Sequence, residues 1–242
     1  MDYYNAEDLF PKEVLQKIKK YAAGKMVYFP KNEEEKSKWG MLSGQKLYYR
    51  KRNQMICNEF LYGVSVVQLA EKYHLSVETI KKIVYSKKNQ ERLSFCPDVE
   101  SAMEYEKETL IEEWIHTYLL FERKNKGFSD GLKKQKRYYL GPVAMPIHLL
   151  KRNSGPEEGM KWKVHKEVFE TRVQNWEKKM RQEEAMPPII AEYKNSQFEI
   201  NCNTPLFEAL LRNKISYYPI ILWCSSEEEY KLLKEKYRPS LI

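Results

Sequence analysis

Basic side chains that could neutralise phosphate groups are concentrated in one part of the chain. Residues 1–97 hold 18 Lys and Arg against 11 Asp and Glu, a net charge of +7, whereas residues 98–242 hold 24 against 23, a net charge of +1. Several of these cations lie in or beside the segment 66–85: Lys46, Arg50, Lys51, Arg52, Lys81, Lys82, Lys87, Lys88 and Arg92. A solvated face usually mixes the two signs more evenly, so the pattern favours contact with the phosphates of a nucleic acid.

The other reactive side chains form no recognisable site for a metal ion or a redox cofactor. The four histidines are scattered, and none belongs to an H-E-x-x-H pattern. The four cysteines, Cys57, Cys96, Cys202 and Cys224, are far apart in the sequence and include no C-x-x-C pair. We therefore expect free thiols in a reducing compartment, no metal ion and no cofactor.

Length and hydropathy bound the class of protein. A chain of 242 residues is long enough for two modest domains, and the uneven charge favours that division. No apolar run is long enough to span a bilayer, and the first ten residues are polar and acidic rather than typical of a signal peptide. These features predict a cytoplasmic protein without a membrane partner.

The segment Val66–Tyr85 supplies the elements that would hold the cations in place. Its sequence, V-V-Q-L-A-E-K-Y-H-L-S-V-E-T-I-K-K-I-V-Y, predicts two short helices around a tight turn. Ala70 is small enough for a close helix contact, and Ser76 precedes the second helix, where its hydroxyl can accept a backbone N–H. His74 holds a turn position that is often left-handed, and histidine tolerates that backbone better than most residues. The combination resembles the DNA-binding helix-turn-helix, and a packed hairpin that touches no DNA is the alternative.

The second helix of this motif has one face available for DNA. Ile80, Ile83 and Val84 are expected to point to the core, which leaves the opposite face outward. Side chains near the start of the helix could meet base edges, whereas the lysines suit bases or phosphates. The residues expected to contact double-stranded DNA are Ser76, Val77, Glu78, Thr79, Lys81, Lys82, Tyr85, Lys87 and Lys88, with Arg50 and Arg52 from the preceding segment.

The residues before the motif predict further elements in a definite order. Asn5–Ala23 is typical of an amphipathic helix, Met26–Pro30 of a short strand, and Lys46–Tyr62 of a second helix stopped by Gly63. The charged stretch Asn32–Lys38 is expected to be a loop. A lone strand with two free edges is unfavourable in a monomer, so this strand favours pairing with a second copy of the chain.

This order of elements over residues 3–88 resembles the Mor-type activators of transposable phages and related small bacterial regulators. The phrases that carry the resemblance are N-A-E-D-L-F-P at Asn5–Pro11, V-Y-F-P at Val27–Pro30, and Lys38-Trp39-Gly40. In that family, paired N-terminal elements form a dimer and each subunit presents one helix-turn-helix. The resemblance therefore implies a homodimeric regulator of transcription.

The C-terminal half predicts a linker followed by a mixed domain. After Pro97, Ser101–Lys124 has the spacing of one long helix, and Phe128–Leu140 is a basic connector. The elements expected beyond residue 141 are helices Val168–Met180, Leu206–Asn213 and Ser226–Lys236 and strands Ile189–Tyr193, Phe198–Asn201 and Tyr218–Cys224. The expected fold class is α+β, with an all-α helix-turn-helix unit and one short strand at 1–96, a linking helix and connector at 97–140, and an α+β domain at 141–242.

Residues 141–223 resemble the ParB/sulfiredoxin-like fold. The phrases that carry this resemblance are R-N-S-G-P-E-E-G-M-K-W, P-P-I-I-A-E-Y and F-E-I-N…F-E-A-L…Y-Y-P-I-I-L-W. Active relatives typically carry Asp/Glu-Gly-x-His-Arg before the helix, where the glycine admits backbone N–H groups to phosphates and the basic residues neutralise them. The corresponding residues here are Asn201, Cys202, Asn203, Thr204 and Pro205, so both cationic groups are missing. We therefore expect this degenerate loop neither to hydrolyse nucleoside triphosphates nor to bind them tightly.

The altered loop leaves several functions open for the C-terminal domain. Sulfiredoxins use a cysteine in this loop, but Cys202 lies one position earlier than theirs and has no His or Arg beside it in the sequence to lower its pKa. A ParB-like nucleotide-dependent kinase or nuclease, targeted by the DNA-binding module, is the competing function for the whole chain. A fold retained to sense an effector or to contact a protein partner fits the altered loop better, so the sequence favours a non-catalytic regulator.

Overall fold

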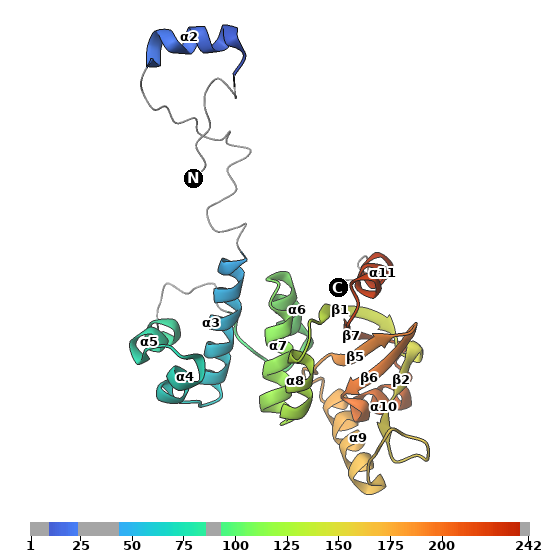
Figure 1. Cartoon of the computed structure of the whole chain (residues 1–242). Helices are drawn as coiled ribbons and strands as arrows, with labels where there is room; N and C mark the ends of the chain where they lie inside the picture. The colour runs from blue at the N-terminus through green and yellow to red at the C-terminus, as the bar shows by residue number, and fades with distance from the viewer. Residues whose placement is uncertain (1–9, 24–43, 86–92, 238–242) are drawn as a thin grey trace. The chain divides into compact units, whose positions relative to one another are not determined.

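The structure, a computed structural model, describes residues 10–23, 44–85 and 93–237. The chain divides into two compact units, residues 1–47 and residues 48–242. The helix-turn-helix and every strand of the described residues belong to the second unit (Figure 1). None of the described helices is long and apolar enough to cross a membrane.

The first unit contains helix α2, Lys12–Ala22. Within the described residues, the helix expected at Asn5–Ala23 begins at Lys12 and ends at Ala22. Pro11 precedes it with φ −58° and ψ 146°, an extended backbone that begins a helix only at the next residue. The expected strand Met26–Pro30 and the loop Asn32–Lys38 lie outside the described residues.

The helix-turn-helix expected at residues 66–85 is confirmed. It consists of α4, Val66–Tyr73, and α5, Val77–Tyr85, which pack on α3, Gln45–Leu61. A small apolar core joins the three helices, and its buried residues are Ile56, Leu69, Ala70, Ile80 and Ile83. The small side chain of Ala70 is buried in this core, where the sequence predicted a small residue between two helices.

The prediction of a single long linking helix at Ser101–Lys124 is wrong. The stretch holds three shorter elements: α6, Val99–Lys107, α7, Ile111–Thr117, and the π-helical turn η2, Tyr118–Glu122. The break falls at Thr109, whose φ of +58° cannot continue a right-handed helix. Leu110 beside the break is fully buried, so the change of direction lets both helices bury their apolar faces in one core.

The expected basic connector Phe128–Leu140 contains regular structure that sequence reasoning missed. Helix α8 is Lys126–Lys133, and strand β1, Tyr138–Pro146, runs across the expected boundary at residue 140. Gly141 has φ +105°, and a Cβ there would lie 2.5 Å from the Ile220 carbonyl oxygen, so the site needs glycine. A glycine followed by proline hides this strand from pattern analysis, because both residues are uncommon inside strands.

Five strands form one mixed sheet in the order β1-β7-β5-β6-β2. The remaining members are β2, Leu150–Arg152, β5, Ile189–Lys194, β6, Gln197–Cys202, and β7, Tyr217–Cys224. The pairs β1–β7 and β5–β6 are antiparallel, whereas β5–β7 and β2–β6 are parallel. A separate parallel pair joins β3, Ser154–Gly155, to β4, Trp162–Lys163. The three strands expected from the sequence are β5, β6 and β7.

The expected C-terminal helices are also confirmed, and the fold class is α+β. These helices are α9, Lys166–Arg181, α10, Thr204–Arg212, and α11, Glu227–Tyr237. A short 3-10 turn, Ile147–Leu149, lies between β1 and β2. The loop that the sequence placed at residues 201–205 spans the end of β6, the connecting Asn203 and the first residues of α10.

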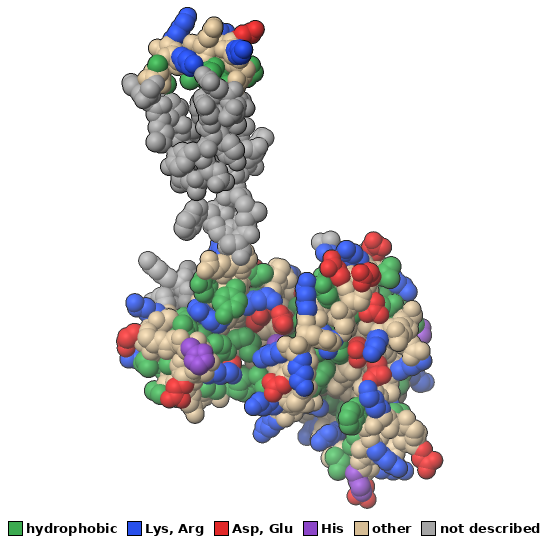
Figure 2. Space-filling model, in the orientation of Figure 1, with side chains coloured by type: hydrophobic (Ala, Val, Ile, Leu, Met, Phe, Trp, Pro, Cys, Tyr) green, Lys and Arg blue, Asp and Glu red, His purple; other side chains and the backbone are tan. Residues whose placement is uncertain are grey.

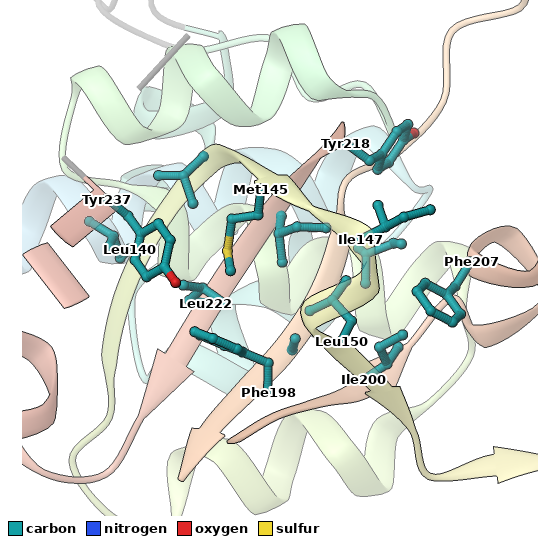
Figure 3. Packing of buried hydrophobic residues seen from close by; sticks show 14 of the residues in the cluster. Leu140, Met145, Ile147, Leu150, Phe198, Ile200, Phe207, Tyr218, Leu222 and Tyr237 are labelled. Carbon is teal, nitrogen blue, oxygen red and sulfur yellow. The ribbon is translucent and has the colours of Figure 1, made fainter. Parts of the chain in front are cut away.

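Alternate residues of β7 are buried in two different cores. Ile220 and Leu222 pack with side chains of α10 and α11, whereas Ile221 and Trp223 pack with α6, α7 and α8. Figure 3 shows the first of these cores, with Phe207 reaching into it from α10. Burial on both faces explains why β7 is almost continuously apolar rather than alternating.

Candidate nucleic-acid interface

The turn between α4 and α5 has the backbone that the sequence predicted. His74 is left-handed, with φ 52° and ψ 46°, at the end of α4. The Leu75 N–H donates to the Ala70 carbonyl at 3.0 Å and so satisfies the last turn of that helix. Ser76 Oγ accepts from the Thr79 N–H at 3.1 Å, which caps the start of α5 as expected.

Helix α5 presents its expected outward face to solvent. Ile80 and Ile83 are buried, and Thr79 is half-buried at the margin of the outward face. The Lys81 ammonium lies 2.9 Å from the Glu78 carboxylate, and this hydrogen bond holds the pKa of that carboxyl below its usual range. The exposed residues are Ser76, Val77, Glu78, Lys81, Lys82 and Tyr85. Lys87 and Lys88 lie outside the described residues.

A buried carboxylate that sequence reasoning missed clamps α3 to α4. Glu59 is 2% exposed, and both of its oxygens lie 2.8 Å from the Lys72 ammonium. The Tyr73 hydroxyl donates to Glu59 at 2.6 Å, and burial together with this bond raises the pKa of Tyr73. The orientation of α4, and through it that of α5, therefore depends on a charge-assisted contact as well as on apolar packing.

The two α3 arginines expected to contact DNA have partners within the protein. The Arg50 guanidinium pairs with the Glu108 carboxylate just beyond α6. Arg52 lies 4.9 Å from the centre of the Tyr49 ring and donates to the Asn53 side-chain oxygen at 3.0 Å. Arg50 thus braces α3 against the end of α6, and contact of either arginine with DNA stays a prediction.

A buried polar cluster joins α3 to the helices that follow it. Asn58 is 2% exposed, and its side-chain oxygen accepts from Gln54 Nε2 and from the Tyr105 hydroxyl, each at 2.9 Å. Its side-chain nitrogen donates to Thr117 Oγ1 at 2.8 Å. Asn58 therefore connects α3 with both α6 and α7, which stand beside it in Figure 1.

An incompletely paired carboxylate lies next to this cluster. One oxygen of Glu113 lies 3.8 Å from the Lys51 ammonium, while the other has no hydrogen-bond partner among the described residues. Burial raises the pKa of Glu113 to about 7 against the opposing charge of Lys51. His116 is also buried there, and burial lowers its pKa to about 3, which keeps the imidazole neutral. The carboxyl of Glu113 therefore titrates near neutral pH.

In the loop at residues 201–205, Asn203 has a role that its sequence position did not indicate. It is 2% exposed and left-handed, with φ 69°. Its side-chain oxygen accepts from the Tyr118 hydroxyl at 2.9 Å, and its side-chain nitrogen donates to the Pro188 carbonyl at 3.1 Å. The loop is thereby tied to η2, the element that follows α7.

The other polar groups of the loop also have partners in the fold. The Asn201 side-chain oxygen accepts from the Trp223 indole N–H at 2.9 Å, and the Thr204 hydroxyl lies 2.9 Å from the Ser154 hydroxyl. Pro205 lies in the first turn of α10, where its missing N–H removes no helical hydrogen bond. These side chains are engaged in holding the loop.

A cavity of about 300 Å³ opens at this loop. Arg123 and Lys124, which follow η2, and Arg172 of α9 line it together with residues 201–205, and we call it the cationic pocket. None of the described residues that line it is acidic. The loop sequence alone missed these cations, because they come from two segments distant in the chain.

The thiol in the cationic pocket is poorly suited to nucleophilic chemistry. Cys202 is buried, and burial raises the pKa of its thiol. The nearby Arg123 guanidinium offsets only part of that rise. A raised pKa keeps the protonated, unreactive form dominant near neutral pH.

Positive charge in the second unit is not confined to α5. Figure 2 shows Lys and Arg side chains gathered over the middle of one face, where α7 and α8 lie in Figure 1. Some cations of this unit serve packing, since the Arg137 guanidinium lies 4.9 Å from the Trp223 ring centre and the Lys136 ammonium 4.8 Å from that of Tyr138. Charge alone therefore does not identify a DNA-binding face, and the helix-turn-helix geometry of α4 and α5 is needed to assign it.

Comparison with known proteins identifies the N-terminal part. Residues 4–94 match the model of the Mor transcription activator family. A protein of Bacillus subtilis (strain 168), named "Uncharacterized protein YraL", is 45% identical over 87 residues, which cover all of that protein and 36% of this chain. Through this part the chain belongs to the Mor transcription activator family, which indicates DNA binding and regulation of transcription. The resemblance of residues 141–223 to the ParB/sulfiredoxin-like fold stays a prediction.

The buried cluster at α3 predicts a specific cost for truncation. Asn58→Ala removes one hydrogen-bond partner each from Gln54, Tyr105 and Thr117 in the interior, and we expect it to lower the free energy of unfolding by about 2–4 kcal/mol. Chemical denaturation followed by circular dichroism measures this change. Asn53→Ala, at a half-buried position of the same helix, is the matched control and should cost less than about 1 kcal/mol. Equal losses of unfolding free energy in the two variants would show that the buried cluster contributes no more to stability than a half-buried side chain of the same helix.

The raised pKa of Glu113 predicts a pH dependence of stability. Between about pH 4.5 and 7 the folded protein keeps a proton on Glu113 that the unfolded chain releases, so the free energy of unfolding falls as the pH rises. Glu113→Gln should remove this loss, and its stability relative to the parent should increase by about 1–3 kcal/mol from pH 5 to pH 8. Glu112→Gln, which changes the more exposed neighbouring carboxylate, is the control. A pH-independent difference for Glu113→Gln would contradict the assignment.

Proposed function

We propose that the protein is a sequence-specific regulator of transcription that places α5 in the major groove of DNA. The observation that carries this proposal is the exposed face of α5, with Lys81 and Lys82 opposite the buried Ile80 and Ile83, in a chain of the Mor transcription activator family. Side chains of the first turn of α5 would meet base edges, and the two lysines would contact bases or phosphates.

We also propose an arrangement of domains, which the same comparison supports. The Bacillus subtilis relative is matched over its whole length by 87 residues, which supports a separable DNA-binding module at residues 1–96. Residues 97–140 would connect this module to a C-terminal domain at residues 141–242. We assign no catalytic role to that domain, because Asn201, Asn203 and Thr204 are engaged in hydrogen bonds within the fold and the Cys202 thiol has a raised pKa.

The proposed regulator acts as a homodimer. The support is the sequence Met26–Pro30, an expected strand with no partner strand nearby in the sequence, together with the family resemblance of the N-terminal part. Two copies could pair these strands and bury Val27 and Phe29 between them. A dimer would present two copies of α5 to two half-sites on the DNA.

Salt dependence of DNA binding tests the assignment of α5. The double variant Lys81→Ala/Lys82→Ala should bind its target DNA more weakly and should lower the slope of log affinity against log salt by up to about 2, if both lysines meet phosphates. Genome-wide mapping of bound DNA supplies the target, and fluorescence anisotropy over a salt series measures the slope. Lys166→Ala/Lys178→Ala removes the same charge from exposed positions of α9 and should leave the slope unchanged. An unchanged slope in the α5 variant would refute the assignment.

Sedimentation equilibrium tests the dimer. We expect both the full chain and a fragment of residues 1–92 to sediment as dimers at micromolar concentration, because the expected strand and the helix before it lie in this part. Phe29→Asp should shift both toward the monomer, since a charge would then be buried at the strand pair. A monomeric fragment beside a dimeric full chain would move the dimer contact to the C-terminal part.

A further inference from the structure

Another cavity, of about 240 Å³, is lined by residues of α3, α7 and α8, which are neighbours in Figure 1. We call it the three-helix pocket. None of the described residues that line it belongs to α5 or to the loop at residues 201–205. Its lining residues are Tyr48, Lys51, Arg52 and Met55 of α3, Glu112, Glu113 and His116 of α7, and Lys133 of α8.

The buried end of this pocket holds two polar side chains with hydrogen-bonding capacity to spare. Glu113 is 5% exposed and His116 is 4% exposed. Glu113 Oε2 and His116 Nε2 have no hydrogen-bond partner among the described residues. A Glu112 oxygen lies 4.0 Å from His116 Nε2, which is beyond hydrogen-bond range. Because a buried polar atom without a partner is costly, this end favours a ligand that supplies one.

The other nitrogen of His116 is engaged, and this contact orients the ring. Nδ1 lies 2.9 Å from the hydroxyl of Ser129, a fully buried residue of α8. Burial lowers the pKa of His116 to about 3, so the imidazole is neutral and has one donor and one acceptor nitrogen. The Ser129 hydroxyl can donate to Nδ1 or accept from it, and Nε2 takes the opposite role in each case.

A ligand hydroxyl matches this pair of groups, because it donates one hydrogen bond and accepts others. It can donate to an ionised Glu113 carboxylate while its oxygen accepts from the Nε2–H of His116. When Glu113 carries a proton, both bonds reverse direction and the hydroxyl still satisfies both partners. The buried end of the pocket therefore recognises a hydroxyl in either protonation state of the carboxyl.

The more exposed part of the pocket is cationic. Lys133 is exposed and Arg52 half-buried, and neither forms an ion pair with a described residue. Lys51 is balanced by Glu112, whose carboxylate lies 2.7 Å from its ammonium. Two cations without a counter-charge suit a carboxylate, which carries a single negative charge. A phosphate dianion would be repelled more strongly by Glu112 and Glu113.

We propose that the three-helix pocket binds a small hydroxycarboxylic acid, with its carboxylate at Lys133 and Arg52 and its hydroxyl at Glu113 and His116. A volume of about 240 Å³ lies below the usual range for drug-sized ligands, which limits the ligand to a few carbon atoms. A molecule bound there contacts α3, α7 and α8 together. The inference does not rest on the proposed function, because the pocket shares no residue with α5 and binding is measured without DNA.

Calorimetry on the full chain tests the ligand class. The probes are lactate and 3-hydroxybutyrate, each compared with the acid that lacks the hydroxyl, propionate or butyrate, and with 1,3-butanediol, which lacks the carboxylate. Chloride keeps the ionic strength constant. We expect saturable binding of a hydroxy acid with a Kd of about 1 mM or tighter, binding of its analogue weaker by about fivefold or more, and no binding of the diol. Absence of saturable binding by both hydroxy acids, or equal affinity for the analogue without the hydroxyl, would overturn the proposal.

Two adjacent lysines separate a specific site from general charge attraction. Lys133 lines the pocket, whereas Lys134 is equally exposed to solvent but does not line it. Lys133→Gln should weaken binding of the hydroxy acid by about fivefold or more, because a charge-assisted contact is lost. Lys134→Gln, the matched control, should leave the affinity unchanged. Equal weakening in both variants would mean that the acid follows net charge, and the site would be rejected.

His116→Asn tests the buried end. The asparagine amide can still bond to the Ser129 hydroxyl, but it is too short to reach the position of Nε2. The variant should therefore bind the hydroxy acid and its analogue within about twofold of each other, with little change in the affinity for the analogue. Circular dichroism checks that the variant is folded, and the Lys133→Gln comparison decides the proposal if it is not. A preference for the hydroxy acid that persists in folded His116→Asn would refute the proposed hydroxyl contact.

Discussion

The position of α3 depends on one constraint: each polar side chain that this helix buries must find a hydrogen-bond partner. One face of α3 places Ile56 in the helix-turn-helix core, and another places Gln54 and Asn58 against α6 and α7. An unpaired amide in this interior would cost about 1–3 kcal/mol, whereas apolar contacts tolerate small shifts. Asn58 must reach Tyr105 and Thr117 together, so hydrogen bonds select one arrangement of α3 on its neighbours.

The parts predicted correctly from the sequence carry their signals within a few residues. In the helix-turn-helix, His74 and Ser76 mark the turn, and the 3.6-residue spacing of apolar side chains gives the outward face of α5 without any long-range information. The same holds for β7, whose unbroken apolar run has no helical period. These elements could be predicted because their signals are local, and the Mor relationship could likewise be recognised from short phrases.

The parts that were missed depend on contacts between segments distant in sequence. Helical spacing continues through Thr109, but burying Leu110 in the core against the sheet requires a break there. In the sequence, Glu59 cannot be distinguished from a solvent-exposed glutamate. Its burial depends on contacts with Lys72 and Tyr73, which the fold brings to it. The loop at residues 201–205 lacks cations of its own, yet the fold brings three cations from other segments to its pocket. In each case the residue types are visible in the sequence, and only their tertiary partners are not.

The π turn η2 connects the loop at residues 201–205 with the end of α3. The Arg123 N–H donates to the Tyr118 carbonyl at 3.0 Å, five residues back, so this turn holds one residue more than an α-helical turn. The extra residue lets the element serve three neighbours: Tyr118 bonds to the loop, Glu122 holds Tyr62, and Arg123 lines the pocket. The hydrogen bonds of such a turn are less favourable than those of an α-helix, so its contacts with neighbouring elements must hold it in place.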